Sequence, residues 1–234
     1  MFRKHDVHKV PHGQQRIWRY LAADRLRDLL DTSEIYFTNL SVFSDGLEGL
    51  LTRRTRDYLY RWYRQQGDSH EKALEEVRLY ERLHSTYFAS CWHMNDHESY
   101  LMWRSYADRG FAVSSTWERA AAAFDDVERD IYGGIVRYID FDREQTDVGN
   151  TFDHIVTKDR PYRDEREVRL LCWKPELLNS PLAPQESGVR VPIKLKMLVE
   201  SVWTNPFYPE MPSDIAVKLS QLNMPVMDST IKHR

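Results

Sequence analysis

The chain has 234 residues, enough for one large domain or two small ones, and 41% of them are hydrophobic, which is sufficient for an ordinary core. Its 33 basic and 36 acidic residues give a net charge of −3, so overall charge points to neither a nucleic-acid nor a membrane partner. Two cysteines exclude a disulfide framework, and no apolar run approaches the roughly 20 residues of a membrane helix. The charged N-terminus lacks the apolar core of a signal peptide. We therefore expect a soluble, cytoplasmic protein with no membrane partner.

The first half of the chain alternates short strands with helices. Polar residues 1–15 predict a flexible tail, and the lack of a convincing linker after them predicts a single domain over 16–234. Apolar spacing indicates strands at 17–20, 34–38, 86–92 and 111–115, and helices at 24–30, 47–66, 70–84, 100–107 and 116–124.

Strands dominate the second half of the chain. This order, with helices concentrated in the N-terminal half, favours an α+β fold over a doubly wound sheet. We expect a mixed, mostly antiparallel sheet core, with two small sheets around a cleft as one possible arrangement. The later strands are expected at 134–141, 166–173, 190–195, 198–204 and 224–228, and the later helices near 151–157 and 213–222.

The charged stretch from Lys158 to Trp173 begins as a turn around Pro161 and ends as a strand. Alternation along this strand separates an apolar face from a charged one. A row of carboxylates and guanidinium groups is costly to bury without partners. The charged face is therefore either solvated surface or the lining of a polar cleft. The apolar face holds Val168, Leu170 and Cys172, and the charged face holds Glu165, Glu167 and Arg169.

Arg19 stands between two aromatic residues early in the first strand and points away from both of them. It is either a surface or ion-paired arginine or a bidentate clamp for phosphate or carboxylate, which its planar guanidinium suits. Further along, Phe43, Asp45 and Glu48 lie in a turn before a helix. We interpret Asp45 as a cap of that helix.

The helix expected over 47–66 carries five arginines on one face. Such a face is either solvated or a contact for an anionic substrate or RNA. The chain has no glycine-rich phosphate loop. Cys91, His93 and His97 lack the ligand spacing that fixes zinc, so we expect no metal site.

Several blocks of the sequence together resemble the bacterial family catalogued as domain of unknown function 2971. The likeness spans most of residues 17–230, with departures at Gly46, Tyr162 and Val168, where the family favours a proline, a tryptophan and an aromatic residue. The blocks are Trp18-Arg19-Tyr20, Tyr36-Phe37, Phe43-Ser44-Asp45-Gly46-Leu47-Glu48, Ala89-Ser90-Cys91-Trp92, Leu101-Met102-Trp103-Arg104-Ser105-Tyr106 with Gly110, and Tyr162 with Glu165, Glu167 and Arg169.

An early strand arginine and a late Glu-x-Glu strand also resemble the arginine–serine–glutamate layout of ADP-ribosyltransferases. That resemblance implies that NAD lies in a cleft between two small sheets, that Arg19 holds its phosphates or ribose, and that an aromatic residue stacks on the nicotinamide. Glu167 would be the catalytic carboxylate and Glu165 would orient or deprotonate the acceptor. The implied cofactor site comprises Arg19, Tyr20, Tyr36, Phe43 and Arg169. The serine motif that this layout places on a middle strand is matched in composition by Ser114-Ser115-Thr116, but Thr116 is better explained as a helix cap.

The leading functional hypothesis is an NAD-binding, ADP-ribosyltransferase-like enzyme that cleaves the nicotinamide–ribose bond, with toxin or antiphage roles. Its partners would be a small-molecule dinucleotide and a protein or nucleic-acid acceptor. The alternative is a non-enzymatic binding or regulatory module that contacts an anionic partner or nucleic acid through the arginine-rich helix. A metal-dependent nuclease comes third, without supporting ligand spacing.

Overall fold

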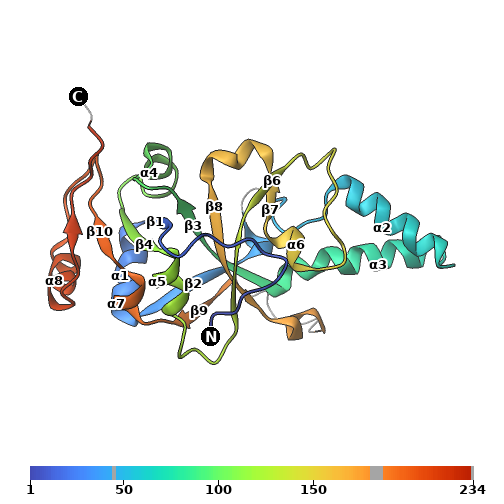
Figure 1. Cartoon of the computed structure of the whole chain (residues 1–234), viewed down its shortest axis with the longest axis horizontal. Helices are drawn as coiled ribbons and strands as arrows, with labels where there is room; N and C mark the ends of the chain where they lie inside the picture. Colours follow the sequence, from blue (N-terminus) through green and yellow to red (C-terminus); the bar gives the residue numbers. More distant parts are fainter. Residues whose placement is uncertain (44–45, 180–186, 233–234) are drawn as a thin grey trace.

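A forked, mostly antiparallel sheet forms the centre of the protein (Figure 1). The computed structural model describes residues 1–43, 46–179 and 187–232. The expected α+β class with a mostly antiparallel sheet is confirmed, but the strands join one large sheet instead of two small ones around a cleft. The large sheet contains β1 (Arg16–Leu21), β2 (Glu34–Asn39), β3 (Tyr87–Met94), β4 (Phe111–Thr116), β5 (Ile131–Ile135), β8 (Glu167–Trp173), β9 (Gly188–Pro192), β10 (Ser201–Trp203) and β11 (Val226–Met227), and a separate parallel pair contains β6 (Arg137–Ile139) and β7 (Thr157–Asp159).

The fork arises because β3 has different neighbours along its two edges. On one edge, β8 pairs with β3 from Tyr87 to His93. On the other edge, β2 pairs with β3 near Ala89, and β1 pairs with it from His93 onward. Between these two contacts, the described chain supplies no strand partner to residues 90–92 on that edge. β1 and β2 therefore diverge from β3 and leave an opening in the sheet.

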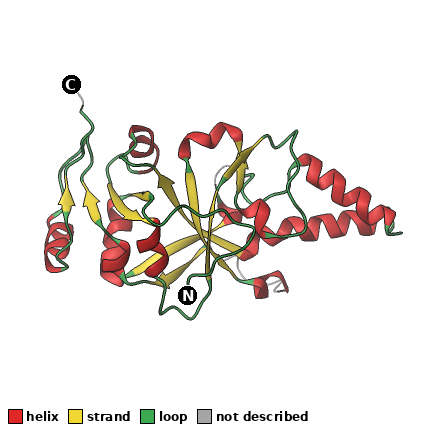
Figure 2. Ribbon diagram, viewed as in Figure 1, coloured by secondary structure: helices red, strands yellow, loops and turns green. Residues whose placement is uncertain are grey.

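One face of the sheet carries the main hydrophobic core. The apolar residues of β8, Val168, Leu170 and Cys172, point into it, so the alternation predicted along this strand is confirmed. Four helices cover this face and contribute buried residues to the core (Figure 2): α1 (Ala23–Thr32), α5 (Trp117–Ala122), α7 (Leu195–Leu198) and α8 (Ser213–Gln221).

The opposite face of the sheet is covered by two smaller clusters. One gathers around α4 (Tyr100–Tyr106) and includes Trp18 and Trp103. The other gathers around α6 (Phe152–Ile155) and includes Tyr87. Because the two clusters are separate, the sheet between them is not sealed by apolar packing.

A helical hairpin projects from the sheet, at the right of Figure 1. It consists of α2 (Arg53–Gln65) and α3 (His70–Arg82). The helix expected over 47–66 begins only at Arg53, because Thr52 accepts a hydrogen bond from the Thr55 N–H at 3.2 Å and caps it. Residues 46–52 therefore form a loop. Short 3-10 turns complete the fold at η1 (Leu40–Val42), η2 (Leu83–Thr86), η3 (Arg160–Glu165) and η4 (Pro175–Asn179).

Residues 1–15, expected to form a flexible tail, pack against β5. Phe2 forms a parallel bridge with Ile131, and the Arg3 N–H donates to the Ile131 carbonyl at 2.7 Å. His8 is buried, with Nδ1 3.1 Å from the Gly133 carbonyl oxygen. Backbone pairing thus docks this segment onto the domain. None of the helices in the described stretches combines the length and the apolar character that a membrane crossing requires.

Candidate functional site

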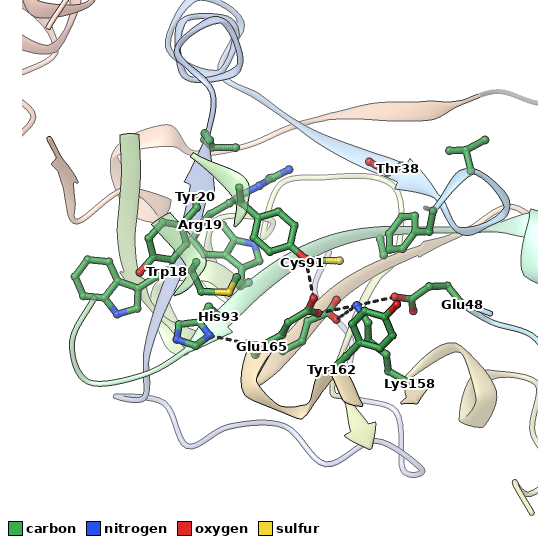
Figure 3. Close-up of a pocket in the computed structure, with 18 residues that line it drawn as sticks. Trp18, Arg19, Tyr20, Thr38, Glu48, Cys91, His93, Lys158, Tyr162 and Glu165 are labelled. Carbon is green, nitrogen blue, oxygen red and sulfur yellow. Dashed lines mark hydrogen bonds and ion pairs between the residues drawn. The ribbon is translucent and has the colours of Figure 1, made fainter. Parts of the chain in front are cut away.

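A cavity of about 490 Å³ lies over the fork, between the α4 and α6 clusters (Figure 3). This volume is within the range of small-molecule sites, about 300–1,000 Å³. Most of its wall is aromatic or apolar, and charged side chains enter at two ends. Its lining includes Trp18, Arg19 and Tyr20 from β1, Thr38, Phe43 and Glu48 from β2 and the chain after it, Cys91 and His93 from β3, Tyr106 from α4, and Lys158, Tyr162, Glu165 and Glu167 from β7 to β8.

Arg169 is the centre of a buried ion network beneath the cavity. Its side chain is 0% exposed, and it donates from Nε to Glu167 Oε1 at 2.8 Å and from Nη1 to the Ile155 carbonyl at 2.7 Å. Nη2 donates to Glu48. All three nitrogens are thus engaged within the protein. Arg169 is not among the cavity-lining residues, so the expectation that it binds a cofactor is corrected: these bonds hold it behind Glu167.

Lys158 joins Glu48, from the loop before α2, to Glu165, at the end of η3, and Glu167, at the start of β8, in one cavity floor. Its ammonium lies 2.8 Å from Glu48 Oε1, 2.6 Å from Glu165 Oε2 and 3.6 Å from Glu167 Oε2. The same ammonium lies 4.8 Å from the centre of the Tyr162 ring. Glu48 reaches this point because it lies in the loop before α2 and not in the helix itself.

The network keeps Glu167 ionised. Burial alone would raise the pKa of Glu167, but Arg169 and Lys158 outweigh burial, and the pKa falls to about 2. Burial raises the pKa of Glu48, and Arg169 offsets that effect only in part. Burial would lower the pKa of Lys158, yet Glu167 and Glu48 raise it. Three carboxyl groups and two cations therefore meet at this end of the cavity, and Glu167 is the carboxyl group that the cations hold ionised.

Arg19 occupies the opposite end of the cavity (Figure 3) and has no counter-charge among the described residues. It leaves β1 on the face opposite Trp18 and Tyr20, as alternation predicts. Nη2 donates to the Tyr36 carbonyl of β2 at 3.0 Å, and the guanidinium lies 5.9 Å from the centre of the Trp92 ring, within the opening of the fork. No carboxylate of the described residues forms an ion pair with it, and burial lowers its pKa to about 10. A half-buried guanidinium that forms no ion pair with a carboxylate of the described residues is well suited to an anionic ligand group.

Cys91 on β3 lies between the two charged ends. Burial, followed in size by the effect of Glu167, raises the pKa of its thiol well above the usual range. The thiol also interacts electrostatically with Arg19. Cys91 is therefore a neutral group at neutral pH, and the polar centre of the cavity carries no additional charge.

Aromatic side chains stand at the mouth of the cavity. Tyr106 is 50% exposed and Tyr162 is 38% exposed, and Phe43 is half-buried. The Tyr106 hydroxyl donates to Glu165 Oε1 at 2.7 Å, which links α4 to η3. These rings offer flat surfaces on which a planar ligand group can stack.

Five of the seven residues predicted for the site line this cavity: Arg19, Tyr20, Phe43, Glu165 and Glu167. Tyr36 does not line it. Tyr36 lies two residues before Thr38 on β2, where its ring packs under Arg25, 5.2 Å from the guanidinium carbon. Only its backbone carbonyl reaches the site, through Arg19. Asp45, interpreted from the sequence as a helix cap, lies outside the described residues.

The serine-rich segment considered for the middle motif is not part of the cavity. Ser114 of β4 lies 2.7 Å from the Ser201 hydroxyl, and Ser115 donates to the Leu198 carbonyl. Thr116 accepts a hydrogen bond from the Arg119 N–H at 3.3 Å, which confirms its interpretation as a helix cap. The position between Arg19 and Glu167 is taken by β3 instead.

Sequence reasoning missed the roles of Glu48, Lys158 and Tyr106. Lys158 stands in the same charged stretch as Glu165. The range 47–66 that is expected to be helical overlaps the turn that holds Glu48, and Thr52, a favoured N-cap residue, is the local signal that the helix begins only after Glu48. Nothing local indicates the contact between Tyr106 and Glu165.

No cluster of three or more His, Cys, Asp or Glu side chains suited to a metal ion occurs within residues 1–43, 46–179 and 187–232. His93 instead bonds through Nδ1 to the Glu165 carbonyl, 2.6 Å away, and His97 is exposed. Comparisons of the chain with protein-family models, curated proteins and solved structures found no match.

Proposed function

We propose that the cavity binds NAD and that the protein is an ADP-ribosyltransferase-like enzyme. One observation carries the proposal: Arg19, which forms no ion pair with a carboxylate of the described residues, and the carboxyl groups around Lys158 line the same cavity from opposite ends. NAD is dipolar in a corresponding way, since its diphosphate is anionic and its nicotinamide ring is cationic. A ligand of this kind would compensate both ends at once.

In this proposal, Arg19 binds the diphosphate through its planar fork. The nicotinamide ring stacks among the aromatic residues at the mouth, Phe43, Tyr106 and Tyr162. Glu167, ionised at neutral pH, lies at the floor. Its carboxylate accepts a hydrogen bond from a ribose hydroxyl and stabilises the positive charge that develops on the ribose.

The reaction breaks the bond between C1′ of the ribose and the nicotinamide nitrogen. The bonding electron pair leaves with nicotinamide, which becomes neutral, and C1′ acquires oxocarbenium character. The acceptor, water or a protein or nucleic-acid group, then bonds to C1′ and releases its proton, which Glu165 is positioned to receive. Cleavage through such a cationic transition state requires a nearby carboxylate.

The resemblance to the family of domain of unknown function 2971 forms part of this proposal. Glu165, Glu167 and Arg169, which carry its late block, are joined here through Glu48 and Lys158. We extend the proposal to a toxin or antiphage role, in which turnover of NAD would harm the cell or an invading phage.

The test is nicotinamide release from NAD by the purified protein. We expect turnover by the wild type and a loss of at least about 100-fold in Glu167→Gln, the scale of removing one preorganised electrostatic group. Glu75→Gln on the exposed surface of α3 is the matched control and should retain full activity. Absence of both turnover and NAD binding in the folded wild type would overturn the proposal.

A further inference from the structure

The outer face of α2 carries a charged and aromatic stripe that plays no part in the cavity. Thr55 and Leu59 turn inward, towards the base of the hairpin. On the outside, Arg54 and Arg61 are exposed, and Tyr58 and Trp62 are 39% and 42% exposed. Although Trp62 packs on the neighbouring Tyr63 ring, the two partly exposed rings of Tyr58 and Trp62 lie one helical turn apart, and an exposed apolar patch is typical of an interaction site. The projecting hairpin in Figure 1 makes this face accessible.

Helical geometry gathers these side chains into one stripe, the α2 stripe, formed by Arg54, Tyr58, Arg61 and Trp62. Their spacing of i, i+4, i+7 and i+8 places them on one side of the helix, with positions four apart separated by about 6 Å along the axis. Guanidinium groups and rings therefore neighbour one another along the helix.

The arginines of the stripe are not held in ion pairs by the described residues of the hairpin. Arg56, next to the stripe, pairs with Glu81 of α3, and Arg64 donates to the Asp68 carbonyl at 2.6 Å. By contrast, neither Arg54 nor Arg61 forms an ion pair with any carboxylate in the described part of the chain. Their positive charge is available to a partner.

We propose that the α2 stripe binds single-stranded nucleic acid. Guanidinium groups bind successive phosphates, and exposed rings stack on unpaired bases, which is the combination that single-strand-binding surfaces use. An acidic polypeptide would pair with the arginines, but its carboxylates would not stack on the two exposed rings. A duplex would present phosphates but keep its bases stacked inside. This inference is independent of NAD binding.

The test is fluorescence anisotropy with labelled oligo(dT) and oligo(U) of about 20 nucleotides, measured without NAD and over a series of salt concentrations. We expect saturable binding by the wild type. Arg54→Gln/Arg61→Gln should weaken binding at least about 10-fold and reduce the log–log salt slope by about 1.4, which corresponds to two phosphate contacts on a single strand. Tyr58→Ser/Trp62→Ser should weaken binding by at least about 30-fold with the salt slope unchanged, because two stacking contacts are lost.

The matched control is Arg78→Gln/Arg82→Gln, which removes two exposed arginines from the other helix of the same hairpin. It should bind like the wild type, and circular dichroism should show native helix content in all three variants. An equal loss of affinity in the control would show that binding depends only on net charge, and it would overturn the proposal. No binding by the wild type, or tighter binding to duplex DNA or poly-glutamate than to the single strand, would overturn it as well.

Discussion

The two charged ends of the cavity use an arginine in opposite ways. Arg169 is fully buried and directs its guanidinium to Glu167, Glu48 and a backbone carbonyl. Arg19 donates to a single backbone carbonyl and faces no carboxylate among the described residues. Charge that is compensated inside the protein holds segments of the fold together. Charge that is left uncompensated beside a cavity is available to a ligand, at the cost of some stability.

The largest effect is expected from removing the compensated arginine. Arg169→Met leaves Glu48 and Glu167 buried without their partner, so the free energy of unfolding should fall by about 3–5 kcal/mol. Urea denaturation measures this change. Arg190→Met, which breaks an exposed pair with Asp28, is the control and should cost no more than about 1 kcal/mol. Similar losses in the two variants would show that the network contributes little to the fold.

Acid should weaken the network end of the cavity and leave the Arg19 end unaffected. The pKa of Glu167 is about 2 in the folded protein, below its ordinary value of 4.5. The stability that this group contributes is therefore present above about pH 4.5 and is lost as the pH falls towards 2, by an amount on the order of 3 kcal/mol. Urea denaturation between these pH values should show that the free energy of unfolding of Glu167→Gln depends less on pH than that of the wild type. Arg19→Met should keep the wild-type profile, and a flattened profile in that variant would contradict the distinction.

Removing the uncompensated arginine should hardly change stability. Arg19→Met loses one hydrogen bond to the Tyr36 carbonyl, worth about 1 kcal/mol, but also relieves the burial of an unpaired charge. Thermal unfolding should therefore show a net change within about 1 kcal/mol. A loss as large as that of Arg169→Met would mean that Arg19 is structural.

The smallest effect is expected at the mouth. Tyr106→Phe removes the hydrogen bond to Glu165 from a side chain that is 50% exposed, so urea denaturation should show a loss of about 0.5 kcal/mol. Tyr100→Phe, on the exposed side of the same helix, is the control. A loss of more than about 2 kcal/mol in the free energy of unfolding would show that Tyr106 of α4 belongs to the buried network, which contradicts its place at the exposed mouth.

The sequence predicts the faces of the strands better than it predicts their partners. Alternation along β8 places Glu167 and Arg169 on one side, because the period of a strand is a local property. The partner of Arg169 is different: Glu48 stands 121 positions away, and its approach depends on the path of the loop before α2. The fork likewise could not be predicted from the sequence, because it depends on which strands pair with each end of β3. For the same reason, Tyr36 could be predicted as half-buried in a strand but not as lying outside the cavity.

The central claim is that one dipolar ligand, NAD, joins the two ends of the cavity, and calorimetric titration tests it most directly. NAD should bind the wild type at a single site, and Arg19→Met should weaken binding at least about 10-fold, because a charge-assisted contact to phosphate is lost. Arg190→Met removes an exposed arginine elsewhere and should leave the affinity unchanged. The account is contradicted if NAD does not bind the folded wild type, or if it binds all three proteins equally.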